Sequence, residues 1–119
     1  MTRIHSLSLG VALAAAALVW SLPATAHQTH ATVKTINVTA FDIGFKLSSK
    51  TAPGGLIVFK VKNTGHLHHD FKISSKKTKL LGPGRSETLR ITLKKATFKY
   101  LCTVPGHAAA GMKGVFKVT

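Results

Sequence analysis

Short runs rich in Val, Ile, Thr and Phe, separated by clusters of Gly, Pro, Asn and Ser, leave this chain few folds to adopt. In residues 59–62 lysines alternate with apolar side chains, and in residues 88–93 Thr and Arg alternate with apolar side chains. A period of two places successive side chains on opposite faces of a strand, which is typical of half-buried strands in an antiparallel sheet. Helical periodicity is almost absent. The pattern predicts an all-β sandwich or barrel.

The runs and the turn residues between them define the expected elements. We predict seven strands, at residues 34–40, 41–47, 56–62, 70–74, 87–93, 97–102 and 114–118. Turns are indicated by glycine and proline at 53–55, 63–65, 82–84 and 105–106. The alanines at 108–110 are compatible with one brief helical turn.

The first 26 residues have the pattern of an export signal. Arg3 supplies a positive start, an apolar run follows at 7–20, and Ala24-Thr25-Ala26 matches a cleavage site. Cleavage would leave residues 27–119, with a polar lead at 27–32 and one domain at 33–119. An uncleaved membrane anchor is the alternative, although the run is short of the roughly 20 residues that span a bilayer. We therefore predict a periplasmic or extracellular protein, membrane-associated if the segment is retained.

The remaining chain is strongly basic. Without Arg3 it has 16 Lys and Arg against 3 Asp and Glu, a net charge of about +13. Such a charge attracts acidic proteins or anionic membrane surfaces, although a merely solvated basic surface is equally compatible with it. No nucleic-acid partner is expected, because no helix-turn-helix or zinc-finger spacing is present.

Cys102 is the only cysteine, so it cannot form an internal disulfide. It begins a short segment that also contains His107 and Met112, with Pro105-Gly106 as a turn. Taken alone, the cysteine and methionine would be core residues and the histidine a surface residue. Together they offer a thiolate, an imidazole and a thioether within one loop.

This donor set favours copper. Two His and one Cys in a plane, with a weak axial Met, describe a blue electron-transfer site. A second histidine is therefore required, and His66, His68 and His69 are the candidates from a distant segment. Zinc is the chemical competitor, but a methionine and a shortage of carboxylates speak against it.

Two segments resemble those of cupredoxins, the plastocyanin and azurin family. Asn63-Thr64-Gly65, three further residues and then His69 are similar to the segment of the first ligand, and this spacing selects His69. Residues 102–107 are azurin-like, with four residues between Cys102 and His107 and four between His107 and Met112. The resemblance implies a Greek-key β-sandwich of about seven to eight strands, with one copper ion near one end.

The resemblance also points to residues around the ligands. Many cupredoxins have asparagine where this chain has Asp70, and an ionised aspartate only accepts hydrogen bonds. Thr103 could supply the hydroxyl or amide donor. An auxiliary copper-capturing patch is a further hypothesis for the histidines of residues 27–119 that are left over, with solvated side chains as the alternative. These histidines are His27, His30, His66 and His68.

The functional expectation is a monomeric one-electron carrier that cycles between Cu(II) and Cu(I). A small apolar patch around His107 would dock the redox partner, and the lysines would steer an acidic one. Copper binding or delivery for homeostasis or tolerance is the alternative. An enzyme is not expected, because one domain of this length leaves no room for a second copper centre.

Overall fold

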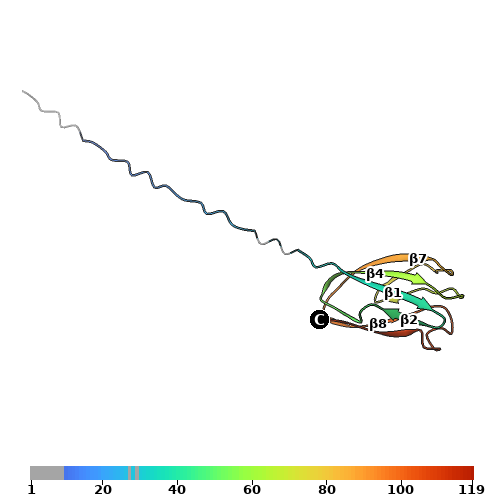
Figure 1. Ribbon diagram of the computed structural model, residues 1–119. Helices are drawn as coiled ribbons and strands as arrows, with labels where there is room; N and C mark the ends of the chain where they lie inside the picture. The colour runs from blue at the N-terminus through green and yellow to red at the C-terminus, as the bar shows by residue number, and fades with distance from the viewer. Residues whose placement is uncertain (1–9, 27, 29) are drawn as a thin grey trace, which may run out of the picture.

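The computed structural model describes residues 10–26, 28 and 30–119. Residues 10–26 are exposed and extend away from a folded domain that starts at Lys34 (Figure 1). Among the described residues, no helix has the length and apolar character needed to cross a membrane. The domain consists of nine strands: β1 Lys34–Phe41, β2 Gly44–Leu47, β3 Thr51–Ala52, β4 Gly55–Asn63, β5 Lys72–Ile73, β6 Lys76–Lys77, β7 Ser86–Leu93, β8 Ala96–Leu101 and β9 Lys113–Val118.

The strands form two packed sheets, which confirms the all-β prediction. One sheet has the order β2-β1-β4-β7 and the other has the order β3-β9-β8-β5-β6. β4 pairs with β7 antiparallel, as the alternation suggested, but it pairs with β1 in parallel. The sheet is therefore mixed. Between β1 and β4 the chain forms β2 in the same sheet and β3 in the opposite sheet, and β4 then runs parallel to β1.

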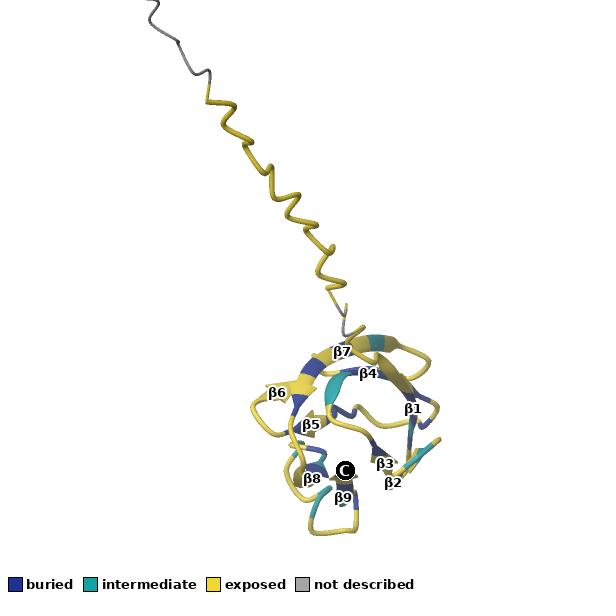
Figure 2. Ribbon diagram, turned by 90° about the vertical axis from the view of Figure 1, so that its left-hand side faces the viewer, coloured by how far each residue is buried: buried dark blue, intermediate teal, exposed yellow. Residues whose placement is uncertain are grey.

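The core lies between the two sheets. Figure 2 shows buried residues in both sheets, alternating with exposed ones along the strands. The ring of Phe59 on β4 lies 5.3 Å from those of both Phe71 and Phe116, which belong to the opposite layer. Lys60 and Lys62, between the buried residues of β4, face outward. The alternation seen in the sequence therefore separates core from solvent.

The strands predicted around residues 41–47 and 70–74 differ from the observed ones. The chain turns at Asp42 and Ile43, so β2 begins only at Gly44. β5 is limited to two residues, and beyond them the Thr103 N–H donates to the side chain of Asp70 instead of to a backbone carbonyl. The two-residue strands β3 and β6 are too short to produce a recognisable alternation, which explains why nine strands are observed.

One end of the sandwich collects the segments that carry the candidate ligands. Ala40 near the end of β1 pairs with Asn63 at the end of β4. Ala40, Cys102 and Met112 form a small buried cluster, separate from the main core. The N-terminal segment joins the domain at the opposite end (Figure 1).

Candidate metal centre

His69 is held by its own backbone between the two sheets. Its N–H donates to the carbonyl of Leu81 at 3.0 Å, and its carbonyl accepts from the Leu81 N–H at 2.7 Å. This isolated bridge leaves the His69 side chain with 0% exposure. A fully buried imidazole needs polar partners for both ring nitrogens, because an unpaired polar group in the interior is costly.

Asn63 organises the loop that leads to this histidine. Its side-chain amide donates to the carbonyls of Leu67 and Leu81, both at 2.8 Å, and its oxygen accepts from Gly65 N–H at 2.9 Å. The Asn-x-Gly motif therefore has a structural purpose. It closes a turn and attaches it to the segment that pairs with His69.

The second loop brings Cys102, His107 and Met112 together through its backbone. The Cys102 N–H donates to the carbonyl of Met112, and the Met112 N–H donates to the carbonyl of His107, both at 3.0 Å. Gly106 and Gly111 have φ values of 84° and 111°, which glycine adopts at little cost. The Ala110 N–H donates to the Gly106 carbonyl, four residues earlier, so this segment forms the single helical turn expected at 108–110 and not a longer helix.

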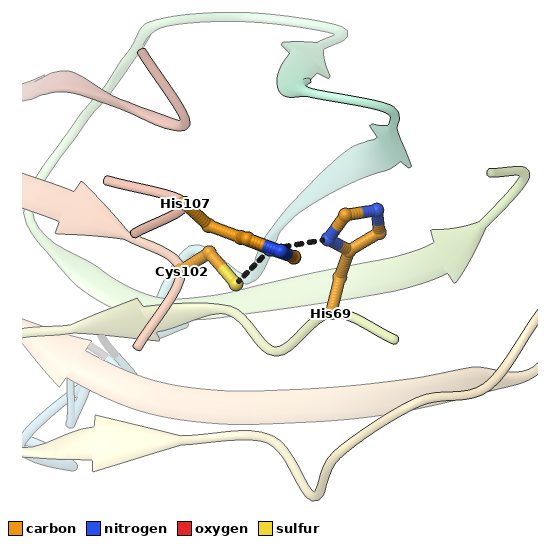
Figure 3. Close-up of side chains that lie close together, drawn as sticks. All are labelled: His69, Cys102 and His107. Atoms are coloured by element: carbon orange, nitrogen blue, oxygen red, sulfur yellow. Dashed lines mark hydrogen bonds between the residues drawn. The ribbon is translucent and has the colours of Figure 1, made fainter. Parts of the chain in front are cut away.

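Three donor atoms converge between the two loops (Figure 3). His69 Nδ1 lies 3.1 Å from His107 Nδ1, which lies 3.6 Å from Cys102 Sγ, and all three atoms are within 4.8 Å of one another. Donors that each lie about 2.0–2.3 Å from one ion are roughly 3–4 Å apart. These residues therefore fit a single metal ion, and Met112 beside them is fully buried.

Burial determines the state of the thiol before a metal binds. Cys102 is 1% exposed, and its burial raises the pKa of the thiol. The thiol is thus protonated in the free protein at neutral pH, and metal binding must displace this proton. A soft thiolate, two imidazoles and a thioether form the donor set of a blue copper site.

The family assignment follows from the whole chain. A sequence profile described as copper binding proteins, plastocyanin/azurin family, matches residues 11–119. The chain belongs to this family. The predicted cupredoxin resemblance and copper as the cofactor are thereby confirmed, and membership supports a copper electron carrier in general terms.

Solved cupredoxin structures have the same fold. A reduced auracyanin from Roseiflexus castenholzii is 28% identical with a TM-score of 0.64, covering 72% of this chain and 97% of its own. Rusticyanin from Thiobacillus ferrooxidans is 20% identical with a TM-score of 0.63, covering 73% of this chain and 77% of its own. Auracyanin A from Chloroflexus aurantiacus, a blue copper protein, is 16% identical with a TM-score of 0.59 and covers 74% and 100%. No curated protein sequence matches the chain.

Asp70 joins the two ligand loops of this cupredoxin. One of its oxygens accepts from Thr103 N–H at 2.6 Å, and the other accepts a short hydrogen bond from the Thr103 hydroxyl. Thr103 thus supplies both of the donors considered from the sequence. Lys77 Nζ lies 3.7 Å from the same carboxylate, which is 5% exposed.

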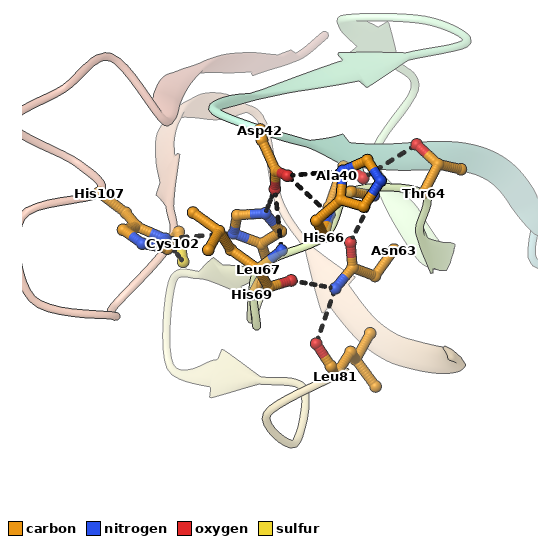
Figure 4. Close-up of polar contacts among 11 residues, drawn as sticks. Ala40, Asp42, Asn63, Thr64, His66, Leu67, His69, Leu81, Cys102 and His107 are labelled. Carbon is orange, nitrogen blue, oxygen red and sulfur yellow. Dashed lines mark hydrogen bonds and ion pairs between the residues drawn. The ribbon is translucent and has the colours of Figure 1, made fainter. Parts of the chain in front are cut away.

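Asp42 is the site residue that sequence reasoning missed. It precedes His69 by 27 residues, and its Oδ1 lies 2.6 Å from His69 Nε2 (Figure 4). The His66 amide and the His69 ring donate to this carboxylate and lower the pKa of Asp42 to about 2. The only signal in the sequence was rarity, because Asp42 is one of three acidic residues.

The other histidines in the described part of the chain do not gather at a second site. His30, His66 and His68 are exposed, and the metal-ligating cluster found in the described part of the chain contains none of them. His66 Nδ1 lies 3.5 Å from Asp42, and His68 lies near Gly82. His27 lies outside the described residues. The auxiliary copper patch remains a prediction without a preformed cluster behind it.

Replacing Asp70 with asparagine should raise the reduction potential of the copper-loaded protein. A nearby negative charge favours Cu(II) over Cu(I), and the amide removes that charge while keeping one acceptor for Thr103. Voltammetry of Asp70→Asn against the parent protein measures the change. Glu87→Gln is the matched control because Glu87 instead accepts from the Lys79 amide. An unchanged or lower potential would refute this charge argument.

Proposed function

We propose that this protein is an exported one-electron carrier whose copper ion, bound by His69, Cys102, His107 and Met112, alternates between Cu(II) and Cu(I). The convergence of three donor atoms, from the buried His69 and Cys102 and the partly buried His107, near the buried Met112 is the observation on which the proposal rests. Cys102 is the strong thiolate donor, the histidines complete the plane, and Met112 is the weak axial ligand.

Pre-organised loops support electron transfer by this site. Asn63 ties down the loop before His69, and Asp70 attaches the segment after it to Thr103, directly beside Cys102. The ligand side chains of His69 and Cys102 are 0% and 1% exposed, so the surrounding protein packs against them. Such a scaffold restricts movement of the ligands, and a small rearrangement favours fast exchange of an electron.

His107 is the ligand closest to solvent. It is partly exposed, whereas the other proposed ligands are buried. Small apolar residues surround it in the loop, and they are Val104, Pro105, Ala108, Ala109 and Ala110. This patch provides a surface on which a redox partner could approach the site without an intervening charged side chain.

Copper delivery is the second candidate, and the exposed histidines favour it. Repeated voltammetric cycling of the copper-loaded protein, with metal content measured before and after, separates the two functions. A carrier keeps its copper through reversible cycles and shows fast self-exchange of electrons by NMR. Loss of copper during cycling, or ready transfer to a competing Cu(I) chelator, would instead support delivery.

Export and the absence of an enzymatic activity belong to the same proposal. The signal-like residues 1–26 support export, and residues 10–26 lie outside the folded domain. Mass spectrometry of the protein from an exporting host would test cleavage after Ala26. The donor set is satisfied by one metal ion, which matches a carrier that binds no substrate.

The outer face of the β2-β1-β4-β7 sheet is proposed to steer an acidic redox protein toward the copper end. Lys46, Thr39, Lys62 and Ser86 occupy one row across the sheet, and Lys60 lies in the next row. All three carboxylates of the chain accept hydrogen bonds from other groups. Among the described residues, the ion pairs involve none of Lys46, Lys60 and Lys62, so this row keeps its positive potential.

Charge reversal on this face should slow electron exchange with a negatively charged surface. Voltammetry of Lys60→Glu/Lys62→Glu at a carboxylate-terminated electrode is expected to show an interfacial rate at least several-fold below that of the parent, with the difference shrinking in high salt. Lys99→Glu/Lys117→Glu is the control, because it changes the net charge equally on the other sheet. Equal rates for the two double variants would contradict steering by this particular face.

A further inference from the structure

The carboxylate of Asp42 contacts the His69 ring at Nε2, on the side of the ring opposite to the metal donors. Asp42 follows β1 in the turn to β2, and its side chain reaches the loop between Asn63 and His69 (Figure 4). Oδ1 lies 2.6 Å from His69 Nε2, and Oδ2 accepts from His66 N–H at 2.6 Å. Leu67 N–H adds a longer bond to Oδ1 at 3.3 Å. One carboxylate therefore contacts two backbone N–H groups and a ring nitrogen of a single loop.

The loop is shaped around this carboxylate. A Cβ atom at Gly65 would overlap the Asp42 carboxylate, so only glycine permits the close approach. Asn63 fixes the same turn through the Gly65 amide. The side chain of Asp42 is 25% exposed, whereas that of His69 is 0% exposed. The carboxylate thus lies at the boundary between solvent and the buried ring.

The contact determines which nitrogen of His69 carries the proton. An ionised carboxylate can only accept, so the Nε2 beside Asp42 must be the donor. A neutral imidazole then has a bare lone pair on Nδ1, and Nδ1 is the atom that faces His107 and Cys102. The ring is thereby oriented with the correct nitrogen toward the metal position before any metal arrives.

We propose that Asp42 is a positioning residue that holds His69 as the Nε2–H tautomer, strengthens it as a metal donor and favours Cu(II). Carboxylate partners of metal-bound histidines act in this way, and removing them typically lowers metal affinity about 10–100-fold. Asp42 and Asp70 divide the task, because Asp42 orients a ligand and Asp70 joins the ligand loops. The claims about metal affinity and Cu(II) rest on the copper ligation proposed above, whereas the claim about the His69 tautomer does not.

Two Asp42 variants test the proposal with and without metal. Asp42→Asn keeps an oxygen acceptor and removes the charge, whereas Asp42→Ala removes both. In the copper-free protein, the nitrogen NMR shifts of His69 should show the Nε2–H tautomer in the parent and a mixture of tautomers in Asp42→Ala. In the copper-loaded protein, both variants should have a raised potential, and Cu(II) affinity should fall about 10–100-fold in Asp42→Ala, with a smaller loss of Cu(I) affinity.

Glu87→Gln is the control, since it removes a carboxylate that contacts the Lys79 amide instead of the site. An unchanged tautomer in Asp42→Ala, or a potential and Cu(II) affinity equal to those of Glu87→Gln, would overturn the positioning role. Asp42→Asn keeps one oxygen acceptor for the loop and provides the same readouts if Asp42→Ala does not fold. If the tautomer changes in Asp42→Ala but the parent protein binds no copper, the positioning role is supported and only the copper ligation is refuted.

Discussion

Cys102→Ser is expected to abolish the blue colour of the copper-loaded protein. The intense visible absorption of such sites arises from charge transfer between a thiolate and Cu(II), and a serine oxygen is a harder and less polarisable donor. Cys102 is the only cysteine, so no second thiolate can replace it. Visible absorption and electron paramagnetic resonance of the protein with one equivalent of Cu(II) measure the loss.

Met112→Leu is the matched control for this experiment. It removes the weak axial donor but approximately preserves the volume of a fully buried side chain. The thiolate band should persist in this variant while the potential changes, because the axial ligand tunes the potential without producing the colour. An intense band that survives in Cys102→Ser would exclude Cys102 as the thiolate ligand.

Phe59→Ala is expected to cause the largest loss of stability in the domain. Phe59 is 0% exposed and its ring packs between Phe71 and Phe116, each with a centroid distance of 5.3 Å. Truncating a buried Phe typically costs about 3–5 kcal/mol, a large part of the roughly 5–15 kcal/mol that stabilises a domain. Urea unfolding of the copper-free protein, followed by circular dichroism, measures the change in the free energy of unfolding.

Val115→Ala is the control for Phe59→Ala, because Val115 lies on β9 with 49% exposure and its truncation should change stability little. Copper should partly restore the stability of Phe59→Ala, since a ligand that binds only the folded state stabilises it. A loss below about 1 kcal/mol in the copper-free protein would show that the surrounding rings collapse into the cavity.

The loop that carries three of the proposed ligands was readable from the sequence, whereas the choice of the fourth ligand, His69, was not readable from local spacing alone. Cys102, His107 and Met112 lie within one loop, so local spacing was enough to identify them. Choosing among His66, His68 and His69 required the family spacing, because all three lie in one short segment. The structure separates them by burial, since His69 is 0% exposed while the other two are exposed.

Sheet pairing was the part of the fold that the sequence described least completely. Alternation located β4 and β7 and assigned their faces, because side-chain direction has a period of two along any strand. It contains no information about the neighbour of a strand, so the parallel pairing of β1 with β4 was not predicted. β3 and β6 escaped detection because two residues cannot establish a period.

The amino-acid sequence by itself determined the all-β class and the soft donor loop at Cys102, because each depends on neighbouring residues. Only the tertiary structure placed Asp42 on His69 Nε2 and Thr103 on Asp70. These contacts join residues 27 and 33 positions apart. The turn between β1 and β2 brings Asp42 to His69, and the pairing of β5 with β8 brings Asp70 beside Thr103. A carboxylate acts over a few ångströms in space, and separation along the chain does not reveal that distance.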